Sequence, residues 1–229
     1  FVLFTIEEKS PGTLKLFSSV IENSQSPTSY ILVKVNSPLQ SVRDLQGKKL
    51  GIFPGSTAKL IAKKSLASVA LDSQTVSIIE MNQGLQIAAL ESGQVDAILV
   101  LEPLKTIAVQ KGIAKDIDSA LFHKYIMHNL PVANSVVSNK YAKANPSQTQ
   151  ALIKATNKAI EFIKTHPQES KEALTSYTPL DKEIITTIPL PEFRTLQTMN
   201  EQEFQSLADL LYKEGELKQK ISAKNMFFT

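Results

Sequence analysis

The feature of this sequence that most constrains its fold is an alternation of strand, turn, helix and glycine that repeats along residues 48–112. Runs typical of strands lie at Lys48–Phe53, Val76–Glu80 and Val95–Leu101. Helical spacing follows each run, at Ser56–Val69, Leu85–Ser92 and Leu104–Lys111, and Gly93 and Gly112 stop the last two helices. A strand that is followed by a helix tends to return to the same sheet in a parallel direction. The alternation therefore predicts a parallel α/β sheet with helices on its faces.

The segments on either side of this region complete the predicted organisation. Strands are expected at Leu14–Ile21, Tyr30–Val35 and Val132–Ser138, and Phe1–Lys9 fits either a strand end or a short helix. Residues 116–131 are irregular, and everything after Ser138 is expected to be helical. We expect an inserted α/β lobe at residues 36–131 and a first lobe built from residues 1–35 and 132–229, with a hinge at Lys34–Asn36 and Pro131–Asn134.

Composition excludes several classes of function. Of the 229 residues, 42% are hydrophobic and 21% are charged, which is ordinary for a globular protein. Lysine and arginine number 25 against 22 acidic residues and are spread along the chain, so no nucleic-acid partner is expected. Cysteine is absent, which excludes disulfides and thiolate chemistry in this sequence. The three histidines form no metal-binding motif, so we expect no metal and no cofactor.

The loops that follow the three strands are the expected ligand site. Ligands of open α/β sheets bind outside the carboxyl ends of the strands. Pro54 and Gly55 break the first strand, and Ser56 or Thr57 is expected to cap the next helix. Backbone N–H groups at such a helix start suit an anion or a polar head group. The predicted ligand-binding residues are Gly55, Ser56, Thr57, Asn82, Gln83 and Glu102, with Asn129 and Pro131 from the exit segment.

Each of these residues also has a purely structural interpretation. Gly55 fits a simple turn, Ser56 a helix cap without a ligand, and Glu102 a charge at a helix start. Asp96 is expected to be structural, and His123 and His128 to be surface or packing residues. The sequence contains no Ser-His-Asp or Gly-x-Ser-x-Gly pattern, so no catalytic residue is predicted.

Three segments together resemble a known family. They are SPLQSVRDLQGKKLGIFPGS at residues 37–56, ALESGQVDAILVLEP at 89–103 and SNKYAKANP at 138–146. As a set they are similar to the substrate-binding proteins of ABC importers, in the group for alkanesulfonates, nitrate and thiamine-precursor pyrimidines. The run MNEQEFQSLADLLYKEGEL also resembles that family's closing helix. The resemblance covers about residues 29–217.

The resemblance implies a two-lobed fold of the periplasmic-binding-protein type (type II), in which one α/β lobe is inserted into the other. It implies capture of a small polar or anionic molecule between the lobes, such as a sulfonate, a nitrate-like anion or a pyrimidine. The partner would be a membrane permease, and the protein would be a monomer that is either periplasmic or extracellular and anchored to the membrane. No signal peptide is recognised in the opening FVLFTIEE.

The resemblance also leaves alternatives open. Enzymes of thiamine and menaquinone precursor synthesis share this fold, and so do ligand-sensing domains. Members of the family begin with two further strand–helix units, which this sequence lacks. We therefore expect residues upstream of Phe1 in a longer protein, and a sheet that carries an unpaired edge or a gap near Leu14–Ile21.

Overall fold

The computed structural model describes residues 1–229, which divide into two compact units. Unit 1 comprises Phe1–Glu22, Asn129–Ala173 and Pro191–Thr229, and unit 2 comprises Asn23–His128 and Leu174–Leu190. Each unit contains one β-sheet of its own, so the two sheets share no strand. None of the helices combines the length and the hydrophobicity needed to cross a bilayer.

The sheet of unit 2 has five strands in the order β4-β3-β5-β2-β6. Their bounds are β2 Ser29–Lys34, β3 Lys49–Ile52, β4 Ser77–Glu80, β5 Ala97–Leu101 and β6 Ala114–Ser119. Strands β4, β3 and β5 are parallel to one another, as the alternation predicted. Strand β2 runs antiparallel to both β5 and β6, so the sheet is mixed.

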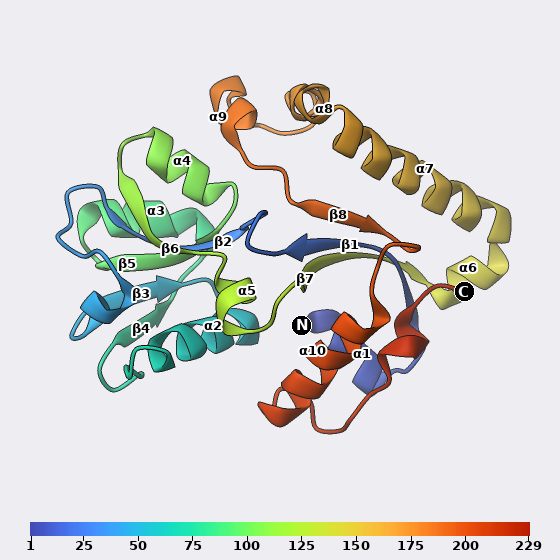
Figure 1. The fold of residues 1–229 in the computed structure, drawn as a ribbon, viewed down its shortest axis with the longest axis horizontal. Coiled ribbons are helices and arrows are strands. Elements are labelled where there is room, and N and C mark those ends of the chain that lie inside the picture. The colour runs from blue at the N-terminus through green and yellow to red at the C-terminus, as the bar shows by residue number, and fades with distance from the viewer. The chain divides into compact units, whose positions relative to one another are not determined.

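Helices cover both faces of this sheet. Their bounds are η1 Val42–Leu45, α2 Ser56–Ala67, α3 Gln83–Ser92, α4 Leu104–Gln110, α5 Leu121–Tyr125 and α9 Lys182–Thr187. Figure 1 shows α3 and α4 on one face and α2 and α5 on the other. Leu32, Ile98 and Val100 point to the first face and form a buried cluster with Leu90 of α3. Burial of such side chains contributes about 1.5–3 kcal/mol each, and this layer holds the strand ends in place.

The stretch that was predicted to be irregular contains both β6 and α5. Strand β6 is an edge strand, and its charged residues Lys115, Asp116 and Asp118 obscure the apolar alternation that marks a strand in sequence. Helix α5 is short and is anchored by Leu121 and Phe122, which are both buried. The correction matters because β6 runs antiparallel to β2 and so ends at the same sheet edge as β5.

The sheet of unit 1 has three antiparallel strands in the order β7-β1-β8. Their bounds are β1 Leu14–Glu22, β7 Leu130–Ser138 and β8 Glu192–Thr195. The expected unpaired edge is wrong for Ser18–Ile21, where β1 is the central strand and pairs with both β7 and β8; residues 14–17 have no partner in β8. Strand β8 also corrects the expectation that only helices follow Ser138.

Helices pack on both faces of this smaller sheet as well. Their bounds are α1 Val2–Lys9, α6 Asn139–Ala144, α7 Pro146–Thr165, α8 Pro167–Leu174, α10 Glu201–Lys213 and η2 Ala223–Met226. The last residue of α8, Leu174, already belongs to unit 2. Figure 1 shows α7 on one face and α1 with α10 on the other. Phe204 of α10 lies 6.5 Å from Phe4 of α1 and 5.2 Å from Phe227, ring centre to ring centre. Aromatic contacts of this kind fix the second layer of the unit.

The chain passes between the units at four points rather than two: after Glu22, His128, Ala173 and Leu190. The predicted hinge at Lys34–Asn36 is not one of them, because Lys34 ends strand β2 inside unit 2. The other predicted hinge, Pro131–Asn134, lies within β7, shortly after the crossing at His128. Residues 23–35 belong to unit 2, whereas the sequence placed them in the first lobe.

Candidate functional site

The candidate site lies at the carboxyl edge of β3, β4 and β5. Because these three strands are parallel neighbours, the loops that follow them meet at one edge of the sheet. Six of the eight predicted residues lie there: Gly55, Ser56, Thr57, Asn82, Gln83 and Glu102. The other two, Asn129 and Pro131, belong to unit 1.

The start of helix α2 is the most distinctive part of this edge. Gly55 occupies the cap position with φ of 114° and ψ of 166°, a conformation that side chains disfavour. The predicted cap by Ser56 or Thr57 is wrong: both residues lie inside the helix, and no side chain caps its start. The first N–H groups of the helix therefore have no intrahelical acceptor, and Ser56 is exposed. Such a helix start attracts negative charge.

Two charged residues at this edge were missed by the sequence analysis. Glu80 ends strand β4, and its Oε2 accepts a hydrogen bond from the Gly55 N–H at 3.3 Å. Its Oε1 lies 2.8 Å from Nζ of Lys59, one turn into α2. The Lys59 ammonium and the Gly55 N–H both lower the pKa of Glu80. The signal in the sequence was a single glutamate at the end of a strand, which the strand-end rule would have selected.

The loop after β4 is held by its own side chain. Asn82 caps helix α3, and its Oδ1 accepts a hydrogen bond from Gly84 N–H at 2.9 Å. Asn82 and Gln83 are exposed, and so is Leu85, at 62% of its surface. The Nδ2 group of Asn82 and the side-chain amide of Gln83 are therefore the polar groups exposed beside a small apolar surface.

Glu102 acts as a charge at the start of a helix, which is the structural interpretation given above for this residue. Its Oε2 accepts a hydrogen bond from Thr106 N–H at 3.2 Å, within the first turn of α4. Its Oε1 is buried and has no hydrogen-bond partner. A buried carboxylate oxygen without a partner is costly, so Glu102 is the acidic group at this edge with unused acceptor capacity.

The two predicted residues of unit 1 lie at the start of β7. Asn129 has a positive φ of 54°, and Pro131 pairs with Ile21 at an irregularity of the β1–β7 ladder. A nearby pocket of about 280 Å³ lies between the sheet and α7. It is lined by Ser18, Ser19, Val20, Ala133, Asn134, Ser135, Thr156, Ala159, Ile160, Ile163 and Phe193. The sequence predicts only a hinge position for Asn134, yet its buried Oδ1 has no hydrogen-bond partner.

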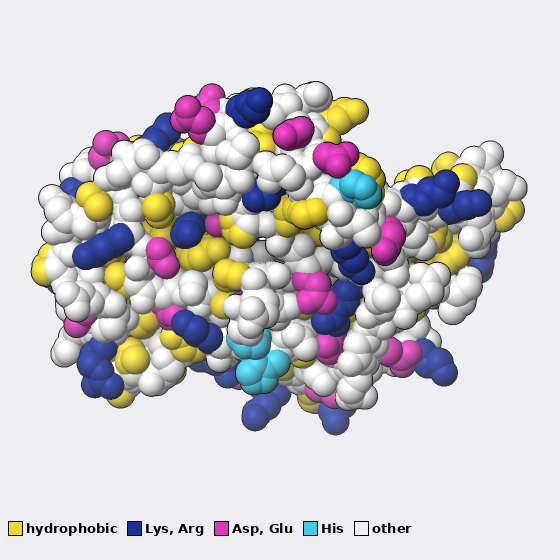
Figure 2. All heavy atoms as spheres, turned by 45° about the horizontal axis from the view of Figure 1, so that its top comes forward, with side chains coloured by type: hydrophobic (Ala, Val, Ile, Leu, Met, Phe, Trp, Pro, Cys, Tyr) yellow, Lys and Arg dark blue, Asp and Glu magenta, His cyan; other side chains and the backbone are white.

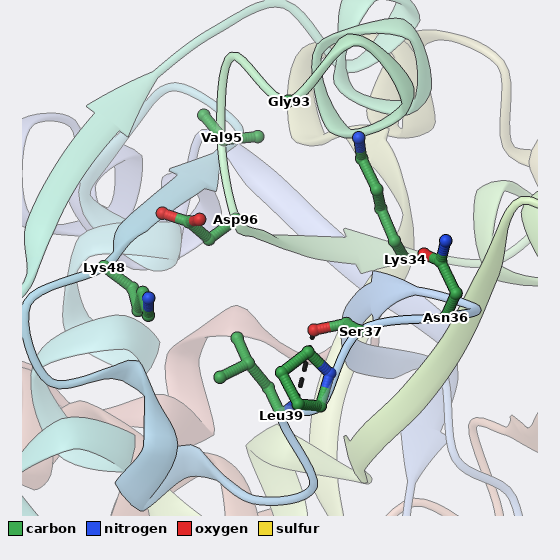
Figure 3. A pocket seen from close by; sticks show the side chains of 9 residues that line it. Lys34, Asn36, Ser37, Leu39, Lys48, Gly93, Val95 and Asp96 are labelled. Atoms are coloured by element: carbon green, nitrogen blue, oxygen red, sulfur yellow. Dashed lines mark hydrogen bonds between the residues drawn. The ribbon is translucent and has the colours of Figure 1, made fainter.

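Unit 2 has a pocket of about 290 Å³ at the edge of its sheet opposite to the candidate site (Figure 3). It is lined by Lys34, Asn36, Ser37, Pro38, Leu39, Lys48, Gly93, Val95 and Asp96. Lys48 and Asp96 precede β3 and β5, so this pocket faces the amino ends of the strands. Asp96 accepts a hydrogen bond from Lys49 N–H at 2.8 Å, which agrees with its predicted structural role.

The chemistry available at the carboxyl edge is hydrogen bonding and charge. It combines uncapped N–H donors at α2, exposed amides at α3 and the carboxylates of Glu80 and Glu102. No group of three or more His, Asp or Glu side chains is placed to hold a metal ion. The edge is therefore suited to holding a small molecule that has both an anionic or polar end and a hydrogen-bond donor.

Comparison with known proteins gives consistent results. The family model described as "NMT1/THI5 like" matches residues 16–170. An aliphatic sulfonates-binding protein of Bacillus subtilis is 27% identical over 201 residues, which is 86% of this chain and 59% of the relative. A protein of Haemophilus influenzae named for thiamine biosynthesis is 28% identical over 164 residues, 70% of this chain and 49% of that relative.

Among solved structures, the periplasmic aliphatic sulphonate binding protein SsuA of Escherichia coli superimposes with a TM-score of 0.75 at 18% identity. The superposition covers 99% of this chain and 72% of that protein. At this identity the likeness confirms the fold, which is the predicted two-lobed α/β class. The chain spans about 59% of the length of the Bacillus subtilis relative.

Proposed function

Because this chain belongs to the NMT1/THI5-like family, we propose that it is part of the solute-binding component of an ABC importer. The proposed protein is monomeric, works outside the cytoplasmic membrane and delivers its ligand to a membrane permease. The likeness in sequence and fold to sulfonate-binding proteins supports this role. The observation that carries it is the uncapped start of α2 at the carboxyl edge of β3.

The proposed ligand is a small organic anion of the sulfonate type. Its charged end would accept hydrogen bonds from the N–H groups of Ser56 and Thr57, where the helix dipole favours negative charge. Asn82 and Gln83 would contact the same ligand from the next loop. Unit 1 would contribute through Asn129 and Pro131. Capture of this kind needs fixed donors and shape, and no group that reacts.

The Ser56→Pro substitution gives a direct test of the N–H donors. Ser56 is the first helical residue of α2, a position that tolerates proline, and Ser56→Pro removes one N–H without altering the helix. We expect this variant to weaken binding of ethanesulfonate about tenfold, the effect of losing one charge-assisted hydrogen bond. Ser56→Ala keeps the N–H and should bind within about twofold of the unchanged protein, since the Ser56 side chain makes no cap.

A thermal-shift screen of the full protein against sulfonates, nitrate and aminopyrimidines comes first. Titration calorimetry then measures the affinity of each variant. Equal affinities for the Ser56→Pro and Ser56→Ala variants would show that α2 does not hold the ligand. Absence of binding to every compound of the screen would count against the importer role itself.

An amino-substituted pyrimidine is the second candidate ligand. The relative named for thiamine biosynthesis supports it, and so does the unused acceptor Oε1 of Glu102. A pyrimidine could also be the substrate of an enzyme built on this fold. Mass spectrometry after long incubation separates the cases, because a carrier returns the pyrimidine unaltered and an enzyme converts it.

A further inference from the structure

Two of the three histidines form a close pair in unit 2. Nε2 of His123 lies 3.2 Å from Nδ1 of His128, and the ring centres are 4.5 Å apart at an interplanar angle of 64°. Two adjoining histidine side chains are visible on the face shown in Figure 2. The sequence separation of five residues gave no reason to expect contact, because residues four apart are neighbours on a helix.

The backbone explains how this spacing closes. Helix α5 ends at Tyr125, and the N–H groups of both Ile126 and Met127 donate to the carbonyl of Phe122, at 3.0 and 3.1 Å. The second of these bonds spans five residues, so it widens the last turn and brings positions 123 and 128 over one another. The pair is thus a product of the helix end and not of the helix itself.

The backbone beside His123 is held in place by buried neighbours and hydrogen bonds. Leu121 and Phe122, which precede it, are buried, and their N–H groups donate to Oγ of Ser29 at 2.9 and 3.3 Å. His123 is half-buried, whereas His128 is exposed and free to adjust its ring. The neighbouring Lys124 ammonium forms an ion pair with Asp118, which compensates its charge. A cation that approaches the pair therefore does not meet an uncompensated lysine at position 124.

We propose that His123 and His128 together bind a divalent transition-metal ion such as Zn²⁺. Two Zn–N bonds of about 2.0–2.1 Å at a tetrahedral angle hold their nitrogens about 3.3 Å apart. The observed separation of 3.2 Å already fits this geometry. A small rotation of the exposed His128 ring directs both lone pairs at one point, and the ion takes the place of the proton that the two nitrogens share.

The protein supplies two ligands and water supplies the others. No third His, Asp or Glu joins the pair, so the site is open rather than a closed structural centre. Imidazole nitrogen favours Zn²⁺, Ni²⁺ and Cu²⁺ over Mg²⁺ and Ca²⁺, which prefer oxygen. Strand β6, which leads into α5, ends at the same sheet edge as β5. The ion would thus lie at the ligand-facing edge, beyond the loops of β3, β4 and β5.

Calorimetric titration of the whole chain with ZnCl₂ at pH 7.5 tests the proposal. N-ethylmorpholine is a suitable buffer, since it neither chelates strongly nor carries a sulfonate. We expect one Zn²⁺ per chain, and at least about tenfold weaker binding in both His123→Gln and His128→Gln, because one imidazole cannot chelate. The third histidine provides a matched control: His166 stacks on Phe162 at 4.6 Å, so His166→Gln should bind Zn²⁺ unchanged.

Ring ¹⁵N spectra give a readout that does not depend on heats. Zn²⁺ should shift Nε2 of His123 and Nδ1 of His128 and leave the ring nitrogens of His166 unmoved. Unshifted ring nitrogens at about 1 mM Zn²⁺, or a double His123→Gln/His128→Gln variant that binds as well as the unchanged protein, would overturn the proposal. Because His128 is exposed, His128→Gln keeps the fold and remains informative if His123→Gln does not.

Discussion

At the scale of single residues, Glu80 places a negative charge at the candidate site. Its carboxylate occupies the position where an anionic ligand would be favoured, next to the start of α2, and it takes up the Gly55 N–H and the Lys59 ammonium. The same contacts that stabilise the loop without ligand therefore compete with an anion. Glu80 thus places a negative charge beside the Ser56 and Thr57 N–H groups that the proposed ligand would use.

Replacing Glu80 by glutamine should separate these two effects. Glu80→Gln should strengthen binding of ethanesulfonate, because a competing negative charge is removed and Lys59 is released. Calorimetry provides the affinity, and Glu91→Gln, in an exposed position on α3, serves as the control. Unchanged or weaker binding by Glu80→Gln alone would mean that the anion does not approach α2.

The pH dependence of stability follows from the same contacts. The pKa of Glu80 is lowered from its ordinary value of 4.5, first by the Lys59 hydrogen bond and then by the Gly55 N–H. A lowered folded-state pKa adds stability above pH 4.5 that is lost as the pH falls through the folded-state pKa. Urea unfolding should thus show the unchanged protein more stable than Glu80→Gln at pH 6, with the difference vanishing in acid. A difference that persists in acid would exclude this explanation.

Gly55 allows a second prediction at this scale. Its φ of 114° is strained for any side chain, although an added Cβ would meet no atom within 4 Å. Gly55→Ala should therefore cost about 1–3 kcal/mol of unfolding free energy through the backbone alone. Gly84→Ala is the matched control, because Gly84 lies in helix α3, where alanine is neutral or stabilising. Equal stability of the two variants in urea would refute the strain argument.

At the scale of elements, Arg194 joins strand β8 to helix α10 in unit 1. Its Nε lies 2.6 Å from Oε1 of Glu192 within the strand, and its Nη1 lies 2.6 Å from Oε2 of Glu203 on the helix. The Arg194 and Glu203 side chains are only 15% and 14% exposed, so water screens this contact weakly. The short strand β8 is thus fixed by a guanidinium that bonds to two carboxylates.

Lysine should not replace this arginine. Arg194→Lys keeps the charge but cannot reach both carboxylates with fixed planar geometry, so we expect a loss of about 1–3 kcal/mol in unfolding free energy. The chain's only other arginine, Arg43, is exposed in η1, and Arg43→Lys should change stability by less than about 0.5 kcal/mol. Chemical denaturation of both variants measures the contrast. Equal effects would remove the special role of Arg194.

At the scale of the whole molecule, the two units are joined by chain crossings and share no sheet. Four crossings connect them, and every backbone ladder lies within one unit. A molecule built this way is able to move its units as rigid bodies, because no strand pairing has to break.

Ligand binding should therefore contract the molecule. We expect a smaller radius of gyration by small-angle scattering at saturating concentrations of whichever compound the screen identifies. The Ser56→Pro variant at the same concentration should contract less, because it binds less of the ligand. An unchanged radius at proven saturation would favour a rigid protein and count against closure.

The sequence by itself determined the three parallel strand–helix repeats and the family. Local patterns suffice for these features, because apolar runs, glycine stops and the segment around residues 41–50 depend only on neighbours in the chain. The same rule placed Gly55, Asn82 and Glu102 at one sheet edge, since parallel strands must end together. The strands β6 and β8 were not predicted because charged residues interrupt the apolar pattern of both: Lys115, Asp116 and Asp118 in β6, and Glu192 and Arg194 in β8.

Tertiary structure alone decided the contacts between residues distant in sequence or oddly spaced. Glu80 reaches Gly55 across 25 positions, and His123 meets His128 through the widened turn that ends α5. The division into units was also beyond local pattern, because residues 174–190 join unit 2 after a long excursion through unit 1. Such contacts depend on where separate elements pack, and packing is set by the burial of whole faces and not by any one segment.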